Sequence, residues 1–141
     1  MPATYRLDLS RRLVWSRAWG ILRDDELAAH SRTLRADPQF APEFSQIQDL
    51  TAVERFELTP AGLQIVAWLN PFGPGARRAV VGPTDVGFGL ARMHQGMRGD
   101  NGDELNVFRD IPAALRWLEL PADWTPPPPG PQDPLFESSG P

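Results

Sequence analysis

The 141-residue chain contains no cysteine and no lysine, and both absences limit what the protein can be. Without thiols there is no disulfide framework, no thiolate nucleophile and no sulfur-ligated metal. All 14 positive residues are arginine, which suits bidentate recognition of phosphate or carboxylate, although genome composition is the simpler explanation. No apolar run approaches the roughly 18 residues of a membrane span, and the N-terminus lacks the apolar segment of a signal peptide. We therefore expect a cytoplasmic protein stabilised by packing.

Groups for covalent catalysis are also scarce. The two histidines, His30 and His94, belong to different predicted helices, and neither a G-x-S-x-G elbow nor an H-E-x-x-H motif occurs. A carboxylate site of Asp49 and Asp85 is conceivable but lacks a third group to orient it, and capping and strand-end solvation explain both residues. We predict a non-catalytic protein with no metal and no cofactor. A net charge of −4 without a basic stripe argues against nucleic-acid binding.

Residues 44–69, FSQIQDLTAVERFELTPAGLQIVAWL, predict a central strand followed by a capped apolar helix. Thr59 supplies a side-chain cap, and Pro60 is the first helical residue. Trp68 lies on the flank of the helix, where it is either deeply buried or faces a ligand or a second subunit. At about 100° per residue, the predicted buried stripe contains Gly62, Ile65, Val66 and Leu69.

The central strand carries polar residues where a buried strand normally carries aliphatic ones. Gln46 and Gln48 share a face with apolar neighbours. Buried amides need hydrogen-bond partners, so this face is either partly wet or lines a polar pocket. Asp49 is predicted near the carboxyl end of the strand, where open α/β sheets bind ligands.

The N-terminal third predicts a hairpin and a helix. Residues 4–9 and 13–22 alternate in polarity and can pair through a turn at 10–12. One face of the second strand carries residues small enough to lie beneath a helix, among them Ser16 and Ala18. Residues 24–36 form the first helix, with acidic residues at its start and arginines near its end. His30 lies on its apolar face, and we predict a satisfied, partly buried histidine rather than a ligand or base.

The second half repeats the strand-helix pattern. After the rigid loop NPFGPGARR, residues 79–83 (AVVGP) predict a short buried strand, and residues 105–108 predict the last one. Thr84 caps a helix that reaches 97, and Asp110 caps a short final helix. Phe88 is expected to point outward, either as a lone surface residue or as part of an interface. The predicted buried stripe of the 84–97 helix contains Val86, Leu90, Met93 and Met97.

Together these elements predict an α/β fold, in which an N-terminal β-hairpin is followed by right-handed βα units. They build a mostly parallel five-stranded sheet flanked by helices. Residues 1–120 form this domain. Residues 121–141 are predicted to be a flexible tail, because eight of the 21 are proline. Trp124 either packs back on the domain or belongs to a disordered end.

Four segments carry a family resemblance. RRLVWSRAWGILRDDELAAH, IQDLTAV with a later AGL, NPFGPGARRAVVGPTDVGFGLARM and VFRDIPAALRWL together look like the bacterial SpoIIAA-like family of STAS-related domains. The resemblance covers roughly residues 4–119 and rests on the whole pattern. It implies a superhelical (β/α) fold shared with anti-sigma-factor antagonists and, more distantly, with SEC14-type lipid carriers. Such relatives bind proteins or small ligands and perform no covalent chemistry of their own.

The resemblance also exposes a departure. The antagonists carry a DSSGL-like element at the start of the helix after the central strand, and a partner kinase phosphorylates its second serine. In this chain the matching residues are TPAGL, so Ala61 occupies the acceptor position. A phosphorylation switch of that kind is therefore in doubt.

Two functions remain open. The first is an interaction or regulatory module that acts through the outward side of its second and third helices, by self-association to a homodimer or by capture of a protein partner. Trp68, Phe88 and Arg92 are its candidate contacts. The second is a carrier or sensor of a small apolar or lipid-like ligand, suggested by the methionines of the 84–97 helix and the surplus aromatics.

A third function ranks below these two. The backbone N–H groups from Thr84 to Val86 would hold an anion at a helix start, helped by Arg109. Asp85 in the same turn opposes this interpretation, because its carboxylate would repel the anion.

Overall fold

The computed structural model describes residues 3–98 and 102–130. Its elements in chain order are β1 (Ala3–Asp8), β2 (Leu13–Arg23), α1 (Asp24–Ala36), β3 (Ser45–Glu57), α2 (Pro60–Trp68), β4 (Arg77–Val81), α3 (Asp85–Met97), β5 (Glu104–Phe108) and α4 (Ile111–Trp117).

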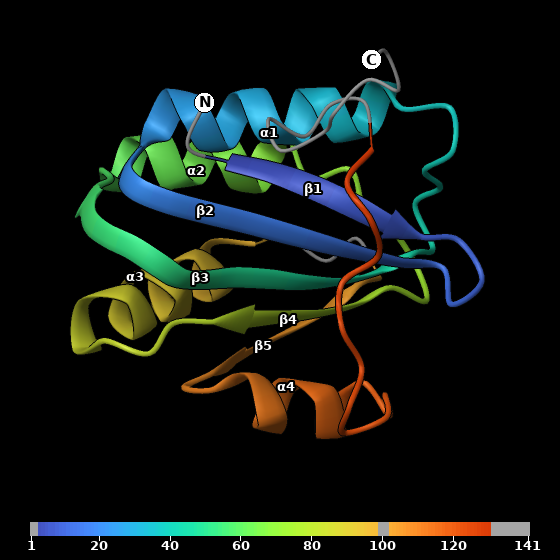
Figure 1. The fold of residues 1–141 in the computed structure, drawn as a ribbon. Coiled ribbons are helices and arrows are strands. Elements are labelled where there is room, and N and C mark those ends of the chain that lie inside the picture. The colour runs from blue at the N-terminus through green and yellow to red at the C-terminus, as the bar shows by residue number, and fades with distance from the viewer. Residues whose placement is uncertain (1–2, 99–101, 131–141) are drawn as a thin grey trace, which may run out of the picture.

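The five strands form one sheet whose spatial order, β1-β2-β3-β4-β5, equals their order along the chain. β1 and β2 form the predicted antiparallel hairpin, with Ala3 opposite Ala18 and Asp8 opposite Leu13. The other three pairs, β2–β3, β3–β4 and β4–β5, are parallel. The predicted α/β class with a mostly parallel five-stranded sheet is therefore confirmed (Figure 1).

Helices cover the sheet on both faces. α1, α2 and α3 lie on one face, and α4 lies on the other (Figure 1). α1 contacts β1 and β2, α3 contacts β3 and β5, and α2 lies between α1 and α3. Because successive side chains of a strand point to opposite faces, each strand divides its residues between these two helical layers. In β2, Ser16 and Ala18 are fully buried toward α1, α2 and α3, as their small size predicted.

Side-chain caps begin three of the helices, at the predicted residues. Thr59 Oγ1 accepts from Gly62 N, Thr84 Oγ1 accepts from Gly87 N, and Asp110 Oδ1 accepts from Ala113 N. Each of these bonds satisfies a backbone N–H that has no partner inside its helix. Thr59 also donates through Oγ1 to Asp24 Oδ2 at 2.6 Å, which ties the start of α2 to the start of α1.

Two strands extend beyond their predicted bounds. β3 does not end near residue 50 but continues to Glu57. Its pairing with β4 ends at Asp49, whereas its pairing with β2 continues to Glu57. Asp49 is consequently in the middle of β3 and not near its carboxyl end. β4 begins at Arg77, so Arg78 is a buried strand residue and not part of the turn-rich loop that the sequence predicted.

The predicted buried stripes of α2 and α3 are wrong in part, because each helix makes a close approach at a glycine: Gly62 of α2 faces Asp24 of α1, and Gly87 of α3 faces Phe56 of β3. Gly62 and Leu63 are buried in α2, whereas Ile65 is 51% exposed. In α3 the buried residues are Gly87 and Ala91. Val86 and Met93, predicted to be inward, are 62% and 42% exposed, because the narrow glycine and alanine side allows closer packing.

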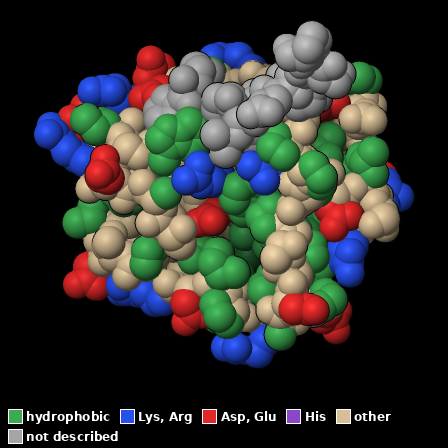
Figure 2. Space-filling model, in the orientation of Figure 1, with side chains coloured by type: hydrophobic (Ala, Val, Ile, Leu, Met, Phe, Trp, Pro, Cys, Tyr) green, Lys and Arg blue, Asp and Glu red, His purple; other side chains and the backbone are tan. Residues whose placement is uncertain are grey.

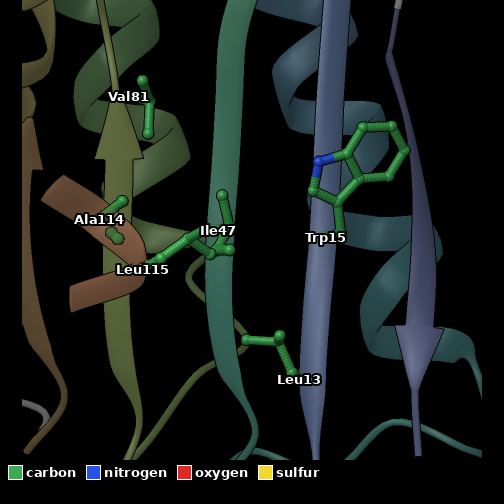
Figure 3. Packing of buried hydrophobic residues seen from close by; sticks show 7 residues of the cluster. Leu13, Trp15, Ile47, Val81, Ala114 and Leu115 are labelled. Carbon is green, nitrogen blue, oxygen red and sulfur yellow. The ribbon is translucent and has the colours of Figure 1, made fainter. Parts of the chain in front are cut away.

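The face that carries α4 holds its own apolar cluster. Leu115 reaches from α4 toward Ile47 of β3, with Leu13 and Trp15 of β2 alongside (Figure 3). Where α4 does not reach, residues 121–130 run across the sheet toward β1 (Figure 1). Trp124 packs on this cluster and its Nε1 donates to Asp8 Oδ2 at 3.2 Å. Trp124 thus packs back on the domain, and residues 131–141 of the predicted tail lie outside the described residues.

Candidate ligand-binding site

A pocket of about 70 Å³ lies between the sheet and the layer of α1, α2 and α3. Its walls are mostly aliphatic and aromatic, with Leu22, Leu27, Phe56 and Leu58 among them. Six polar side chains also line it, and they come from both helices and strands. They are His30, Ser31, Gln46, Gln48, Arg78 and His94. The face of β3 that carries the two glutamines therefore lines a pocket, and that pocket is mostly apolar with a few polar side chains.

A chain of hydrogen bonds crosses the pocket floor from β4 to β2. Arg78 Nε donates to Gln46 Oε1 at 2.9 Å. Gln46 Nε2 donates to Ser16 Oγ at 2.9 Å and to Gln48 Oε1 at 3.2 Å. Ser16 Oγ in turn lies 2.9 Å from His30 Nε2. Register makes this chain possible, because Gln46 is directly opposite Arg78 and Ser16 is directly opposite Gln48.

Arg78 sets the direction of this chain. A guanidinium group only donates, so the oxygen of Gln46 must face it and the Gln46 amide nitrogen must face away. That nitrogen requires an acceptor, which orients Gln48 with its oxygen toward Gln46. The remaining donor, Gln48 Nε2, is buried without a hydrogen-bond partner among the described residues. A buried donor without an acceptor costs about 1–3 kcal/mol, so an acceptor placed at this atom would be stabilising.

His30 and His94 both line the pocket, although they belong to different helices. His94 makes a backbone hydrogen bond at Leu63, and its Nδ1 is buried with no partner in the part of the chain that the structure describes. Burial and the charge of Arg78 lower the pKa of His30 to about 4. The same two causes, burial being the larger, lower the pKa of His94 to about 4. Both side chains are therefore neutral near pH 7.

Positive charge exceeds negative charge beside the pocket. Arg78 Nη1 lies 3.5 Å from Asp103 Oδ2, and Arg98 forms an ion pair with the same carboxylate. Asn70 joins them, accepting from Arg78 Nη1 at 3.0 Å and donating to Asp103 Oδ2 at 3.2 Å. Burial lowers the pKa of Arg78 to about 10, so it stays charged near pH 7. Within residues 3–98 and 102–130, two buried guanidinium groups thus share one carboxylate.

Ser16 and His30 do not form an activated nucleophile with an oriented base. The Ser16–His30 contact resembles a catalytic pair, but Ser16 is fully buried and is not among the pocket-lining residues. Its oxygen already accepts from Gln46, and the pKa shift of His30 has no contribution from a carboxylate that would orient the ring. What faces the pocket is a set of hydrogen-bond donors and acceptors in an apolar shell.

The sequence-predicted surface contacts do not line the pocket. Trp68 is 81% exposed, so it faces outward from α2. Arg92 is also exposed. Phe88, expected to point outward, is half-buried against the core beneath α3, with the guanidinium of Arg109 at 4.2 Å from its ring centroid. Asp49 accepts from Thr51 N and Oγ1 at 2.9 and 2.6 Å, which matches local solvation of a carboxylate.

The groups proposed for an anion site at the start of α3 are engaged with one another. Thr84 Oγ1 accepts from Gly87 N at 3.0 Å. Arg109 Nη1 donates to Asp85 Oδ1 at 2.8 Å. The cation expected to assist anion binding is therefore neutralised by the carboxylate that was expected to oppose it.

Sequence reasoning missed the residue on which the pocket depends. Arg78 was taken for a loop arginine, because it follows a run of glycine and proline residues and a second arginine. The signal that did point here was the pair Gln46 and Gln48, whose unusual place in an apolar strand indicated a polar face. His30 and His94 were noted, but helical periodicity does not tell which two helices face the same space.

Other classes of site find little support in the described chain. None of its helices combines the length and apolarity needed to cross a bilayer. In residues 3–98 and 102–130, no group of three or more His, Asp or Glu side chains is placed to hold a metal ion. On the face shown in Figure 2, arginine and carboxylate side chains are interspersed. Comparisons with models of protein families, with curated proteins and with solved structures gave no match to this chain.

Proposed function

We propose that this protein is a non-catalytic binding protein that takes up a small molecule in the pocket between its sheet and α1, α2 and α3. The observation that carries the proposal is the pocket itself, which combines apolar walls with buried polar atoms that lack partners. An apolar pocket with a few convergent polar groups is the usual form of a small-molecule site. Leaving those buried polar groups without hydrogen bonds costs free energy, so a ligand that forms hydrogen bonds with them would stabilise the folded protein.

The size of the pocket restricts the cargo. An apolar cavity of about 150 Å³ is known to hold benzene, whereas this pocket has about 70 Å³. The ligand therefore has only a few non-hydrogen atoms, or it inserts a short chain. A whole lipid requires displacement of α2 or α3, so the sensor of a small ligand is favoured over a lipid carrier.

The resemblance to STAS-related domains is compatible with this function and stays part of the proposal. The chain-order sheet with helices between its parallel strands supports a superhelical STAS-like arrangement. Ala61 at the position of the phosphorylated serine favours control by a bound ligand over control by a kinase. Ligand occupancy between α1, α2 and α3 would then be the regulatory signal.

The test is binding to the full-length chain, followed by two-dimensional amide NMR. Propan-1-ol is a suitable neutral probe, because its short carbon chain suits the apolar walls and the small volume of the pocket. We expect shift changes concentrated at pocket-lining residues. Ala91→Leu adds carbon atoms to the pocket wall and should abolish them, while Ala61→Leu adds the same atoms on the exposed side of α2 and should not. The proposal fails if charged and neutral probes alike leave the lining residues unchanged.

A second candidate function rests on the outward face of α2. Trp68 and Ile65 lie one helical turn apart and are 81% and 51% exposed. Large exposed apolar side chains that lie together mark interaction surfaces. Sedimentation velocity over a range of protein concentrations tests this candidate. It predicts self-association that Trp68→Ala abolishes, and a strict monomer for both proteins contradicts the homodimer.

A further inference from the structure

We propose that the ligand of the pocket is a small organic monocarboxylate with a short apolar body. This inference rests on the proposed function and specifies its ligand class. It draws on three features of the pocket: the direction of its hydrogen bonds, the balance of its charges and the chemistry of its walls.

The direction of the hydrogen bonds shows which kind of atom must enter. Because Arg78 can only donate, the amides of Gln46 and Gln48 are oriented in series, and the series ends on a donor, Gln48 Nε2. Arg98 Nε is a second buried donor without a partner among the described residues. Arg98 does not line the pocket, so the unused donor that faces the pocket is Gln48 Nε2, and the ligand atom that meets this nitrogen is an acceptor.

The charge balance selects an anion over a neutral acceptor. Among residues 3–98 and 102–130, Arg78 and Arg98 share one carboxylate, that of Asp103, whose side chain is fully buried. His30 and His94 are neutral near pH 7, so they do not change the net charge of this group. The two guanidinium groups and one carboxylate carry a net charge of +1, and an unpaired charge is costly to bury. A single negative charge on the ligand neutralises it, whereas a neutral alcohol or ketone does not.

The walls decide between kinds of anion. Apart from the six polar side chains, the lining consists of aliphatic and aromatic residues with Gly87 and Pro71. Inorganic phosphate has no apolar surface to place against them and requires more donors than the pocket supplies. A carboxylate on an alkyl chain of two or three carbon atoms matches the walls, the single charge and the volume of about 70 Å³.

The decisive comparison uses two compounds with one carbon skeleton, propanoate and propan-1-ol, with inorganic phosphate as a third probe. Each is titrated near pH 7 into the ¹⁵N-labelled full-length protein while the amide shifts of the lining residues are followed. We expect the acid to bind at least tenfold more tightly than the alcohol, and phosphate to cause no shift at these residues. Equal or stronger binding of the alcohol overturns the inference.

Substitutions of Gln48 test the same contact from the protein side. Gln48→Glu replaces the donor by a carboxylate of nearly equal size and should weaken the acid at least tenfold, while the alcohol still binds. Gln64→Glu makes the same charge change on the exposed side of α2 and should bind both compounds as the wild type does. If Gln48→Glu does not fold, Gln48→Leu removes the donor without adding charge and is expected to lose the preference for the acid. Undiminished preference in a folded Gln48 variant overturns the inference.

The outcomes also separate the two proposals. If neither compound shifts the lining residues of the wild type, the pocket is not a binding site, and the proposed function and the ligand class fall together. If the alcohol binds and the acid does not, the binding function stands and only the monocarboxylate is wrong.

Discussion

Arg78 is the residue that determines the polarity of the pocket. Its side chain lies in the core of the sheet, with Phe72 at 4.5 Å beneath the guanidinium, and it reaches Gln46, Asn70 and Asp103. The charge of Arg78 contributes to the lowered pKa values of both histidines. A single substitution here therefore changes hydrogen bonding, charge and titration at the same time.

The two buried histidines should make the protein less stable in acid. The folded pKa values of His30 and His94 are about 4, against 6.5 in the unfolded chain. Between pH 6.5 and 4 the unfolded state binds more protons, so the stability contributed by these groups is complete above pH 6.5 and is lost as the pH falls. The slope reaches about 1.4 kcal/mol per pH unit for each histidine. Urea unfolding measured near pH 7 and near pH 5 should show this loss.

Variants show how much each residue contributes to this dependence of the free energy of unfolding on pH. His94→Gln should remove about half of it. Arg78→Met should raise both histidine pKa values, because the repulsive charge is gone, but leave them below 6.5, because burial is the larger cause. Proton NMR titration of the imidazole signals reports both values. Equal stability near pH 5 and pH 7 in the wild type would contradict the buried neutral state of the two rings.

At the scale of the element, α3 shows how small residues set the face of a helix. Periodicity of large apolar residues predicted Val86 and Met93 inward, but the helix turns Gly87 and Ala91 to the sheet. A Cβ on Gly87 would lie 3.0 Å from Cζ of Phe56, a tighter contact than most packed carbon atoms make, so the Phe56 ring would have to shift. The helix approaches the sheet at this position because the side chain is absent.

The glycines of α3 provide a matched test. A Cβ on Gly89 meets nothing within 4 Å, so Gly89→Ala should stabilise the protein by about 0.8–1 kcal/mol through helix propensity. Gly87→Ala gains the same propensity but pushes against Phe56, so its melting temperature should lie below that of Gly89→Ala. Thermal unfolding by circular dichroism compares the two variants. Identical melting temperatures would show that the contact at Gly87 does not limit the packing of α3.

In the whole molecule, the face of the sheet that carries α4 is covered partly by a non-helical segment, residues 121–130. α4 covers β4 and β5, while residues 121–130 pass over the β1 side (Figure 1). Arg6 Nη1 donates to the carbonyl of Pro127 at 3.2 Å, and Trp124 binds Asp8 on the same strand. A proline-rich segment suits this role, because it is extended and its ordering costs little backbone entropy.

Two tryptophan substitutions test that role. Trp124→Ala removes a half-buried ring and its bond to Asp8, and should lower the free energy of unfolding by about 1–3 kcal/mol. Trp68→Ala removes a ring that is 81% exposed and should change it by less than about 0.5 kcal/mol. Chemical unfolding followed by circular dichroism measures both. If Trp124→Ala is as harmless as Trp68→Ala, residues 121–130 do not contribute to the stability of the sheet.

The sequence by itself determined the elements and their order. Alternation predicted the hairpin, the caps at Thr59, Thr84 and Asp110 started helices where the structure has them, and the fold class followed from the strand-helix succession. These features depend on residues close together along the chain. Gln46 and Gln48 even indicated the polar face, because a buried amide is unusual enough to be noticed locally.

Only the tertiary structure decided which residues form the pocket. Arg78 is a neighbour of Gln46 through strand register, and His30 and His94 line the same pocket because α1 and α3 pack on the same face of the sheet. Likewise, α3 turns Gly87 and Ala91 inward, which the periodicity of large residues does not reveal. Hydrogen-bond direction and charge balance are properties of groups that lie far apart in the sequence, so the pocket emerges only when the sheet brings those groups together.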